Sequence, residues 1–117
     1  MYRYAEGNGT AARFYEIRDI DFLSSTKLIC TDRTNHCLRL ANLSLSPPET
    51  STFAGTCTTL GNADGHRLNS ALFRYPTCTV VKSDNSALFV LDDYNTLHII
   101  DLNSDNVAQV VTFDTYS

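Results

Sequence analysis

Short runs of apolar and β-branched residues alternate along the chain with polar segments rich in Gly, Pro, Asn, Asp and Ser. The runs are about four to seven residues long, which is typical of strands and too short for packed helices. The pattern therefore predicts an all-β fold. The expected strands span residues 17–23, 27–32, 37–43, 52–57, 77–82, 87–92, 97–102 and 107–113.

The second half of the chain repeats the first. Residues 12–14 (Ala-Arg-Phe) match 71–73 (Ala-Leu-Phe), and residues 27–32 match 87–92, so that the period is about 59 to 60 residues. Residues 38–40 match 97–99 at an offset of 59 again, so the spacing shortens by one residue in the turn between Asp32 and Cys37, where a change of length is tolerated. Four sequential antiparallel strands followed by a long polar connector describe a blade of a β-propeller better than half of a sandwich. We therefore expect two four-stranded propeller blades.

The repeat resembles the NHL family of propellers. Residues 32–40 (Asp-Arg-Thr-Asn-His-Cys-Leu-Arg-Leu) resemble the stretch that names NHL repeats. Residues 52–57 and 61–65, with Ala71, Phe73 and Pro76, resemble that family's step into the next blade. The second copy departs from the pattern, because it has Asn95-Thr96-Leu97 without the histidine, and the first copy has Ile17 in place of Pro76. The resemblance implies a preceding-blade tail and connector at 1–16, a blade at 17–57, a connector at 58–76 and a second blade at 77–117.

The four cysteines, Cys30, Cys37, Cys57 and Cys78, lack the spacing of a zinc site, and an even number in a short chain favours disulfides. If Pro47 is the centre of the hairpin that joins 37–43 to 52–57, Cys37 and Cys57 lie opposite each other and are close enough to pair. Cys30 and Cys78 are expected to be buried thiols. A bridge between these two, linking the blades, is the alternative.

Charge and glycosylation signals bear on the compartment. The chain carries 9 basic and 13 acidic residues without clusters of either sign, which disfavours a nucleic-acid partner. No apolar stretch is long enough to span a membrane. Two glycosylation sequons begin at Asn8 and Asn42, and together with the cysteines they indicate a secreted or extracellular protein.

The acidic and amide side chains of the turns are expected to form hydrogen bonds with backbone groups of the same turns. Asp32, Asn35, Asp92 and Asn95 follow predicted strands, where such side chains satisfy turn amides locally. Residues 62–65 (Asn-Ala-Asp-Gly) lack the ligand spacing of an EF-hand loop. We therefore predict no metal site, no cofactor and no catalytic residues.

The histidines, His36, His66 and His98, are too scattered for a metal motif. His98 occupies the position that Arg39 has in the first copy. The exchange of two polar residues at one position predicts an exposed place for both.

One rim of the predicted blades carries the longer loops, and functional residues tend to lie on such loops. The contact-capable side chains expected there are Arg33, Tyr94, Arg67, His66 and Asp93.

The predicted function is a non-enzymatic module that binds a protein or a glycan, as a segment of an extracellular NHL-type propeller. Alternatives are a fragment of a secreted propeller enzyme, such as a metal-dependent peptide-amidating lyase, and an RNA-binding NHL domain, which the acidic balance disfavours. Two blades leave two apolar faces open. The partners that would cover them are the rest of a propeller in the same chain or further copies of this chain, with a trimer as one solution.

Overall fold

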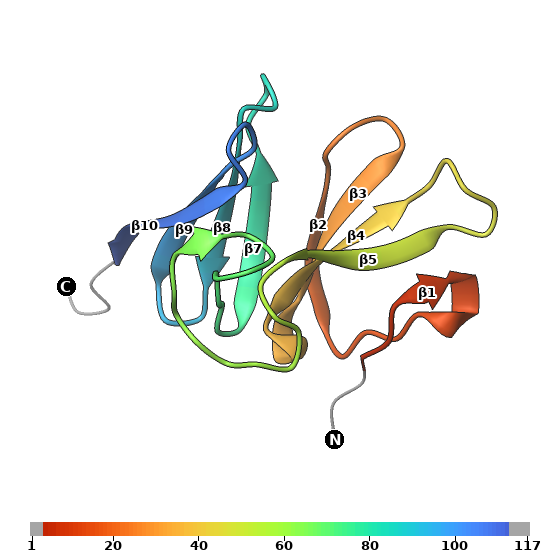
Figure 1. The fold of residues 1–117 in the computed structure, drawn as a ribbon, viewed down its shortest axis with the longest axis horizontal. Coiled ribbons are helices and arrows are strands. Elements are labelled where there is room, and N and C mark those ends of the chain that lie inside the picture. The colour runs from red at the N-terminus through yellow and green to blue at the C-terminus, as the bar shows by residue number, and fades with distance from the viewer. Residues whose placement is uncertain (1–3, 113–117) are drawn as a thin grey trace.

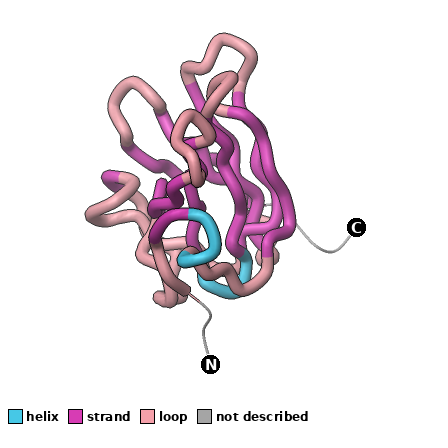
Figure 2. The backbone as a smooth tube through the Cα atoms, turned by 90° about the vertical axis from the view of Figure 1, so that its right-hand side faces the viewer, coloured by secondary structure: helices cyan, strands magenta, loops and turns pink. Residues whose placement is uncertain are grey.

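The structure is a computed structural model that describes residues 4–112, and it confirms the all-β fold (Figure 1). It contains two five-stranded antiparallel sheets. Within these residues, helical structure is confined to two short 3-10 segments, η1 (Gly9–Ala11) and η2 (Arg33–Asn35) (Figure 2). The first sheet has the order β1 (Gly7–Asn8), β5 (Glu49–Ala54), β4 (Cys37–Asn42), β3 (Lys27–Asp32), β2 (Ile17–Phe22), and the second has the order β6 (Gly65–His66), β10 (Asn106–Thr112), β9 (Thr96–Asp101), β8 (Ala87–Asp92), β7 (Pro76–Val81).

The observed strands follow the predicted ones closely, with one displaced element. Strands β3 and β8 have the predicted bounds, whereas β5 begins three positions earlier than expected, at Glu49 instead of Thr52. Asn42 pairs with Glu49 and Leu40 with Ser51, so the hairpin is centred between residues 45 and 46 and not at Pro47. Residue 113, the predicted end of the last strand, lies outside the described residues.

Strands β1 and β6 were not expected, and they extend the repeat into the connectors. β1 pairs with Glu49–Thr50 of β5, and β6 pairs with Asn106–Val107 of β10. An isolated bridge follows in each case, between Ala5 and Arg13 and between Ala63 and Leu72. Residues 5–13 are thus the counterpart of the connector segment 63–72, and each folds over the outermost long strand of its own sheet.

The hydrophobic core lies between the two sheets. Ile29 and Leu38 from the first sheet meet Leu88 and Ile100 from the second, and all four are fully buried. Phe73 from the connector joins the same cluster with no exposed surface. Each such side chain contributes about 1.5–3 kcal/mol by leaving water. The face of each sheet toward this core is called its inner face below, and the opposite face its outer face.

Two aspartates join the sheets where β2 and β7 lie side by side (Figure 1). Oδ2 of Asp19 accepts a hydrogen bond from the backbone N–H of Thr79 at 3.0 Å, and Oδ2 of Asp21 accepts one from Val81 at 2.7 Å. The other oxygen of Asp21 accepts the N–H of Phe22 at 2.8 Å. Edge strands present backbone donors that need partners. These carboxylates supply partners for both strands at once.

Removing the Asp21 carboxylate should therefore weaken the contact between the sheets. We predict that Asp21→Ala lowers the free energy of unfolding by about 1–3 kcal/mol, because the partly buried N–H of Val81 loses its acceptor. Urea unfolding followed by far-UV circular dichroism measures this. The matched control is Glu49→Ala, which removes an exposed carboxylate on β5, away from the contact between β2 and β7. Equal stability of the two variants would contradict the role of Asp21.

Candidate functional site

The turns β3–β4 and β8–β9 lie at the same end of the molecule (Figure 1). Together with the segments that lead into β2 and β7, they form a surface that we call the turn rim. It consists of residues 15–16, 33–36, 74–75 and 93–95. Three of the five predicted contact residues, Arg33, Asp93 and Tyr94, belong to it.

Arg33 links the two turns across the gap between the sheets. Its guanidinium forms ion pairs with Glu16, at 3.1 Å, and with Asp93 of the other turn. It also lies 4.8 Å from the ring centre of Tyr75. Hydrogen bonds from Thr77, and then from Arg33, lower the pKa of Asp93 below its ordinary value. The charges at this point of the rim are already paired with one another.

Two aromatic rings are exposed on the rim. The side chain of Tyr94 is 50% exposed, and Arg74 stacks 4.2 Å from its ring centre. Tyr15 is also exposed, on the segment that enters β2. Nη2 of Arg74 lies 3.4 Å from Oγ1 of Thr96, which holds the guanidinium in place. The rim therefore offers flat apolar surfaces beside hydrogen-bond donors.

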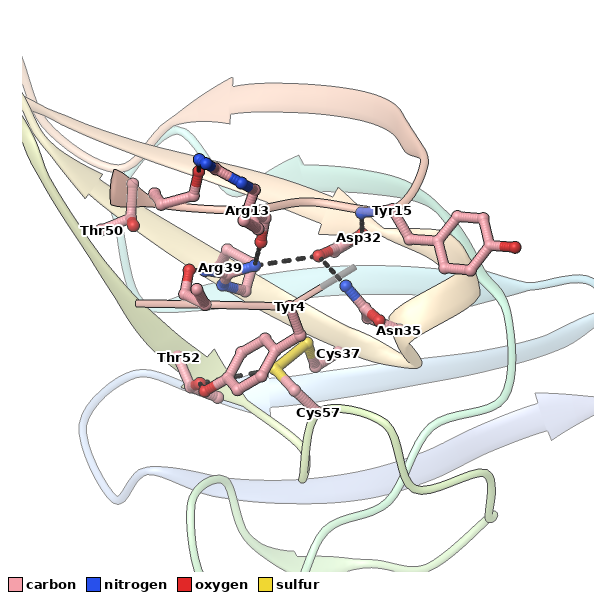
Figure 3. A network of polar contacts seen from close by, with 12 residues as sticks. Tyr4, Arg13, Tyr15, Asp32, Asn35, Cys37, Arg39, Thr50, Thr52 and Cys57 are labelled. Atoms are coloured by element: carbon pink, nitrogen blue, oxygen red, sulfur yellow. Dashed lines mark hydrogen bonds and ion pairs between the residues drawn. A yellow bond between two sulfur atoms is a disulfide. The ribbon is translucent and has the colours of Figure 1, made fainter. Parts of the chain in front are cut away.

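A buried aspartate anchors the first half of the rim from below (Figure 3). Oδ1 of Asp32 accepts hydrogen bonds from the backbone N–H groups of Tyr15, at 2.9 Å, and Glu16, at 3.2 Å. Oδ2 accepts from Nδ2 of Asn35 at 2.8 Å and from Arg39 at 3.0 Å. The expectation that Asp32 serves its own turn is only partly right, since its backbone partners lie on the segment before β2.

Asp92 anchors the second half in the equivalent place. Its Oδ1 accepts the backbone N–H groups of Tyr94, at 2.8 Å, and Thr96, at 3.0 Å, as predicted for a turn residue. Nε2 of His98 donates to Oδ2 at 3.1 Å. Burial raises the pKa of Asp92, but the hydrogen bonds from His98, Thr96 and Tyr94 outweigh it and leave the pKa below its ordinary value.

The prediction that Arg39 and His98 are exposed is wrong, because neither side chain has any exposed surface. Both point to the face on which the aspartate of the neighbouring strand lies. There the buried guanidinium of Arg39 is paired with Asp32, and Nε2 of His98 is hydrogen-bonded to Asp92. Arg39 also lies 4.8 Å from the ring centre of Tyr4 and 4.4 Å from that of Phe14.

The expected placement of Arg67 and His66 on this rim is also wrong. Nε of Arg67 lies 3.1 Å from Oδ1 of Asp105, in the turn at the opposite end of β9 from Tyr94. His66 belongs to β6 and is held at the same edge of the second sheet. The connector leaves the rim and pairs with β10 through β6. A strand of two residues leaves no signal in the sequence pattern, so this path was not predicted.

His36 is a rim residue whose role was not predicted. It is buried, with a positive φ of 61°, and its Nδ1 accepts the backbone N–H of Tyr75 at 3.1 Å. Burial, and then the charge of Arg33, lower the pKa of His36. This contact joins the β3–β4 turn to the segment that enters β7. The histidine occurs only in the first copy, and this departure from the repeat is the signal that could have identified it.

The predicted disulfide between Cys37 and Cys57 is confirmed, for a different geometric reason. Cys57 lies beyond the end of β5, since Leu38 pairs with Ala54 and the chain then turns at Gly55 with a φ of 88°. A side chain at Gly55 would meet the ring of Phe73 at 2.9 Å. The bridge joins the base of the β3–β4 turn to the start of the connector, and closing a loop of 20 residues stabilises by about 3 kcal/mol in the chain-entropy model.

The other two cysteines are free thiols. Cys30 is buried as predicted, and burial raises its pKa to about 11. Cys78 is exposed, so its predicted burial is wrong: it lies on the outer face of the second sheet, which the described residues leave uncovered.

The two predicted glycosylation sites are Asn8 and Asn42. Asn8 is exposed, and the side-chain oxygen of Asn42 accepts hydrogen bonds from Ser44. Glycosylation of both stays a prediction.

Within residues 4–112, no three His, Cys, Asp or Glu side chains gather closely enough to hold a metal ion. In the same part of the chain, no helix has the length and apolar character of a membrane span.

No protein-family model and no curated protein matches the chain. A solved structure does: an auxiliary nutrient binding protein from Bacteroides thetaiotaomicron VPI-5482, with 21% identity and a TM-score of 0.64. The match covers 93% of this chain and 26% of that protein. The two therefore share a fold, and this chain corresponds to about a quarter of the neighbour's length.

The carboxylate of Asp92 should make stability depend on pH in a defined range. A lowered pKa in the folded state stabilises the fold above the ordinary value of 3.8, and this contribution is lost as the pH falls through the folded pKa. We predict that Asp92→Asn lowers the free energy of unfolding at pH 7 by about 1–3 kcal/mol, because the amide donor then faces His98.

The difference between Asp92→Asn and the wild type should shrink below pH 3.8, because the wild-type carboxyl then becomes neutral as well. Chemical unfolding at a series of pH values measures both proteins, and every other carboxylate titrates equally in the two. A difference that stays constant from pH 7 to pH 3 would show that folding does not lower the pKa of Asp92.

Proposed function

We propose that this chain is a non-enzymatic binding module that contacts a protein or a glycan through the turn rim. The observation that carries the proposal is the exposed ring of Tyr94, held by Arg74 above a buried aspartate. Aromatic rings provide large contact areas at a low entropic cost, and they stack on the apolar faces of ligands. Tyr15 and Arg33 extend the same surface.

The architecture supports a role as two consecutive blades of an extracellular NHL-type propeller. Each sheet has four sequential antiparallel strands and a connector folded over its outer edge, and the first strands of the two sheets lie side by side. Radially repeated sheets of this kind are the building units of propellers. The disulfide and the exposed sequon at Asn8 favour the secretory route.

The neighbour in structure is compatible with this proposal. Its name describes a nutrient binding protein, and a binding module on the same fold needs no catalytic residues. Fold similarity at 21% identity does not indicate that the two proteins bind the same ligand, so the proposal rests on the residues of the turn rim.

A glycan array probed with the full chain tests the glycan form of the proposal. For a glycan that binds, Tyr94→Ala should weaken the affinity about tenfold, because it removes the exposed ring, whereas Tyr94→Phe should retain most of the binding. Leu45→Ala is the control, since Leu45 is also exposed but lies in the turn between β4 and β5, away from the rim.

Isothermal titration gives the affinities of all three variants. Equal binding by Tyr94→Ala and Tyr94→Phe would place the ligand elsewhere and overturn the rim as the binding site. An empty array would exclude the glycan form and leave a protein ligand at the same surface.

A further inference from the structure

Each of the two outer sheet faces carries exposed apolar side chains in the described part of the chain. On the first sheet, Ile20 is 53% exposed and Phe22 is 56% exposed. On the second sheet, Val80 is 56% exposed. Beside it, Phe89 and Ile99 line a hollow with a volume of about 530 Å³. Open apolar sheet faces of this kind mark interaction surfaces.

The repeat shows what each outer face is built to meet. Phe89 and Ile99 are the counterparts of Ile29 and Leu40, which pack into the core on the inner face of the first sheet. The outer face of the second sheet is therefore a second copy of a surface that is already covered by a sheet within this molecule.

The outer face of the first sheet is in turn the counterpart of the inner face of the second sheet, which is the other side of the internal contact. Its ladder pairs Ile20 with Cys30, as the ladder of the second sheet pairs Thr79 with Val90, so Ile20 is the counterpart of Thr79. Thr79 is 2% exposed because it faces the first sheet. Ile20, in the same position, faces no sheet among the described residues.

Two larger side chains match the hollow. Phe22 is the counterpart of Val81, and Leu43, which is 42% exposed, is the counterpart of Leu102. Val81 and Leu102 pack against the core between the sheets. If the outer face of a second copy's first sheet lay against this outer face as the two sheets of one molecule lie against each other, its Phe22 and Leu43 would enter the hollow beside Ile99.

We propose that the outer face of the second sheet binds the outer face of the first sheet of a second copy of this chain, in the geometry of the internal contact. The two surfaces differ, so the association is head-to-tail and leaves a free face at each end of a dimer. Such contacts continue until a ring closes or a filament forms. The inference rests on the proposed stacking of blades and is independent of the ligand at the turn rim.

The free thiol of Cys78 provides a direct test. Cys78 is the counterpart of Asp19, whose carboxylate lies 3.0 Å from the backbone nitrogen of Thr79. In the proposed assembly, Cys78 of one copy therefore lies beside residue 20 of the next. Within one molecule the two positions lie on opposite outer faces, so they cannot be joined.

We predict that Ile20→Cys, treated with a short bismaleimide, gives a ladder of covalent dimers, trimers and larger species on denaturing gels. The same variant carrying Cys78→Ser should run as a monomer on these gels, and so should the wild type. Each then has one reactive thiol per copy, because Cys30 is buried and Cys37 and Cys57 form a disulfide. Wild-type dimers joined through Cys78, or dimers of the double variant joined through residue 20, would show face-to-face association and overturn the proposal.

Sedimentation without a cross-linker gives an independent measurement. The wild-type mass should rise with concentration beyond that of a dimer, and Phe22→Asp should raise the concentration needed by roughly tenfold or more. Because Phe22 is exposed, this variant should keep the wild-type circular dichroism spectrum. A wild-type chain that stays monomeric at every concentration and gives no ladder would exclude a second copy as the partner. Glycan binding through Tyr94 is measured separately, so failure of either proposal leaves the other intact.

Discussion

A buried carboxylate at the end of the second long strand of each sheet organises this molecule. Asp32 and Asp92 occupy equivalent positions. Asp32 pairs with the buried Arg39 and Asp92 with the buried ring of His98, each on the next strand, while both accept backbone N–H groups of the turn rim. A carboxylate without these partners could not remain charged in the interior. The strands hold the aspartates, and the aspartates in turn fix the segments that carry Tyr15 and Tyr94.

The two sheets satisfy the same requirement with different residues. Arg39 is long enough to reach past Asp32 to the carbonyl groups of Ala5 and Arg13, so the N-terminal segment is tied to the first sheet. The shorter His98 packs against the ring of Phe73, with ring centres 5.2 Å apart. Arg39 is covered by the ring of Phe14, and His98 by the ring of Phe73, its counterpart in the second copy. The two connectors therefore cover equivalent positions, although the covered residue differs.

The strands and the disulfide pair could be predicted from the sequence because short apolar runs, a repeat and the spacing of cysteines are local signals. The burial of Arg39 could not, since it depends on a carboxylate seven positions away that only the strand register brings to the same face. The short strands β1 and β6 were missed because two residues carry no periodicity. The rim was assigned in part: Arg33, Asp93 and Tyr94 lie on it, whereas Arg67 follows the connector to Asp105.

Amide hydrogen exchange measured by NMR tests the role of these aspartates most directly. In the wild type, the amides of Tyr15, Glu16, Tyr94 and Thr96 should be protected, because each donates to a buried carboxylate. Asp32→Ala should release the amides of Tyr15 and Glu16 and leave those of Tyr94 and Thr96 protected. If the amides of Tyr15 and Glu16 exchange at the same rate in both proteins, Asp32 does not hold the rim and the account is wrong.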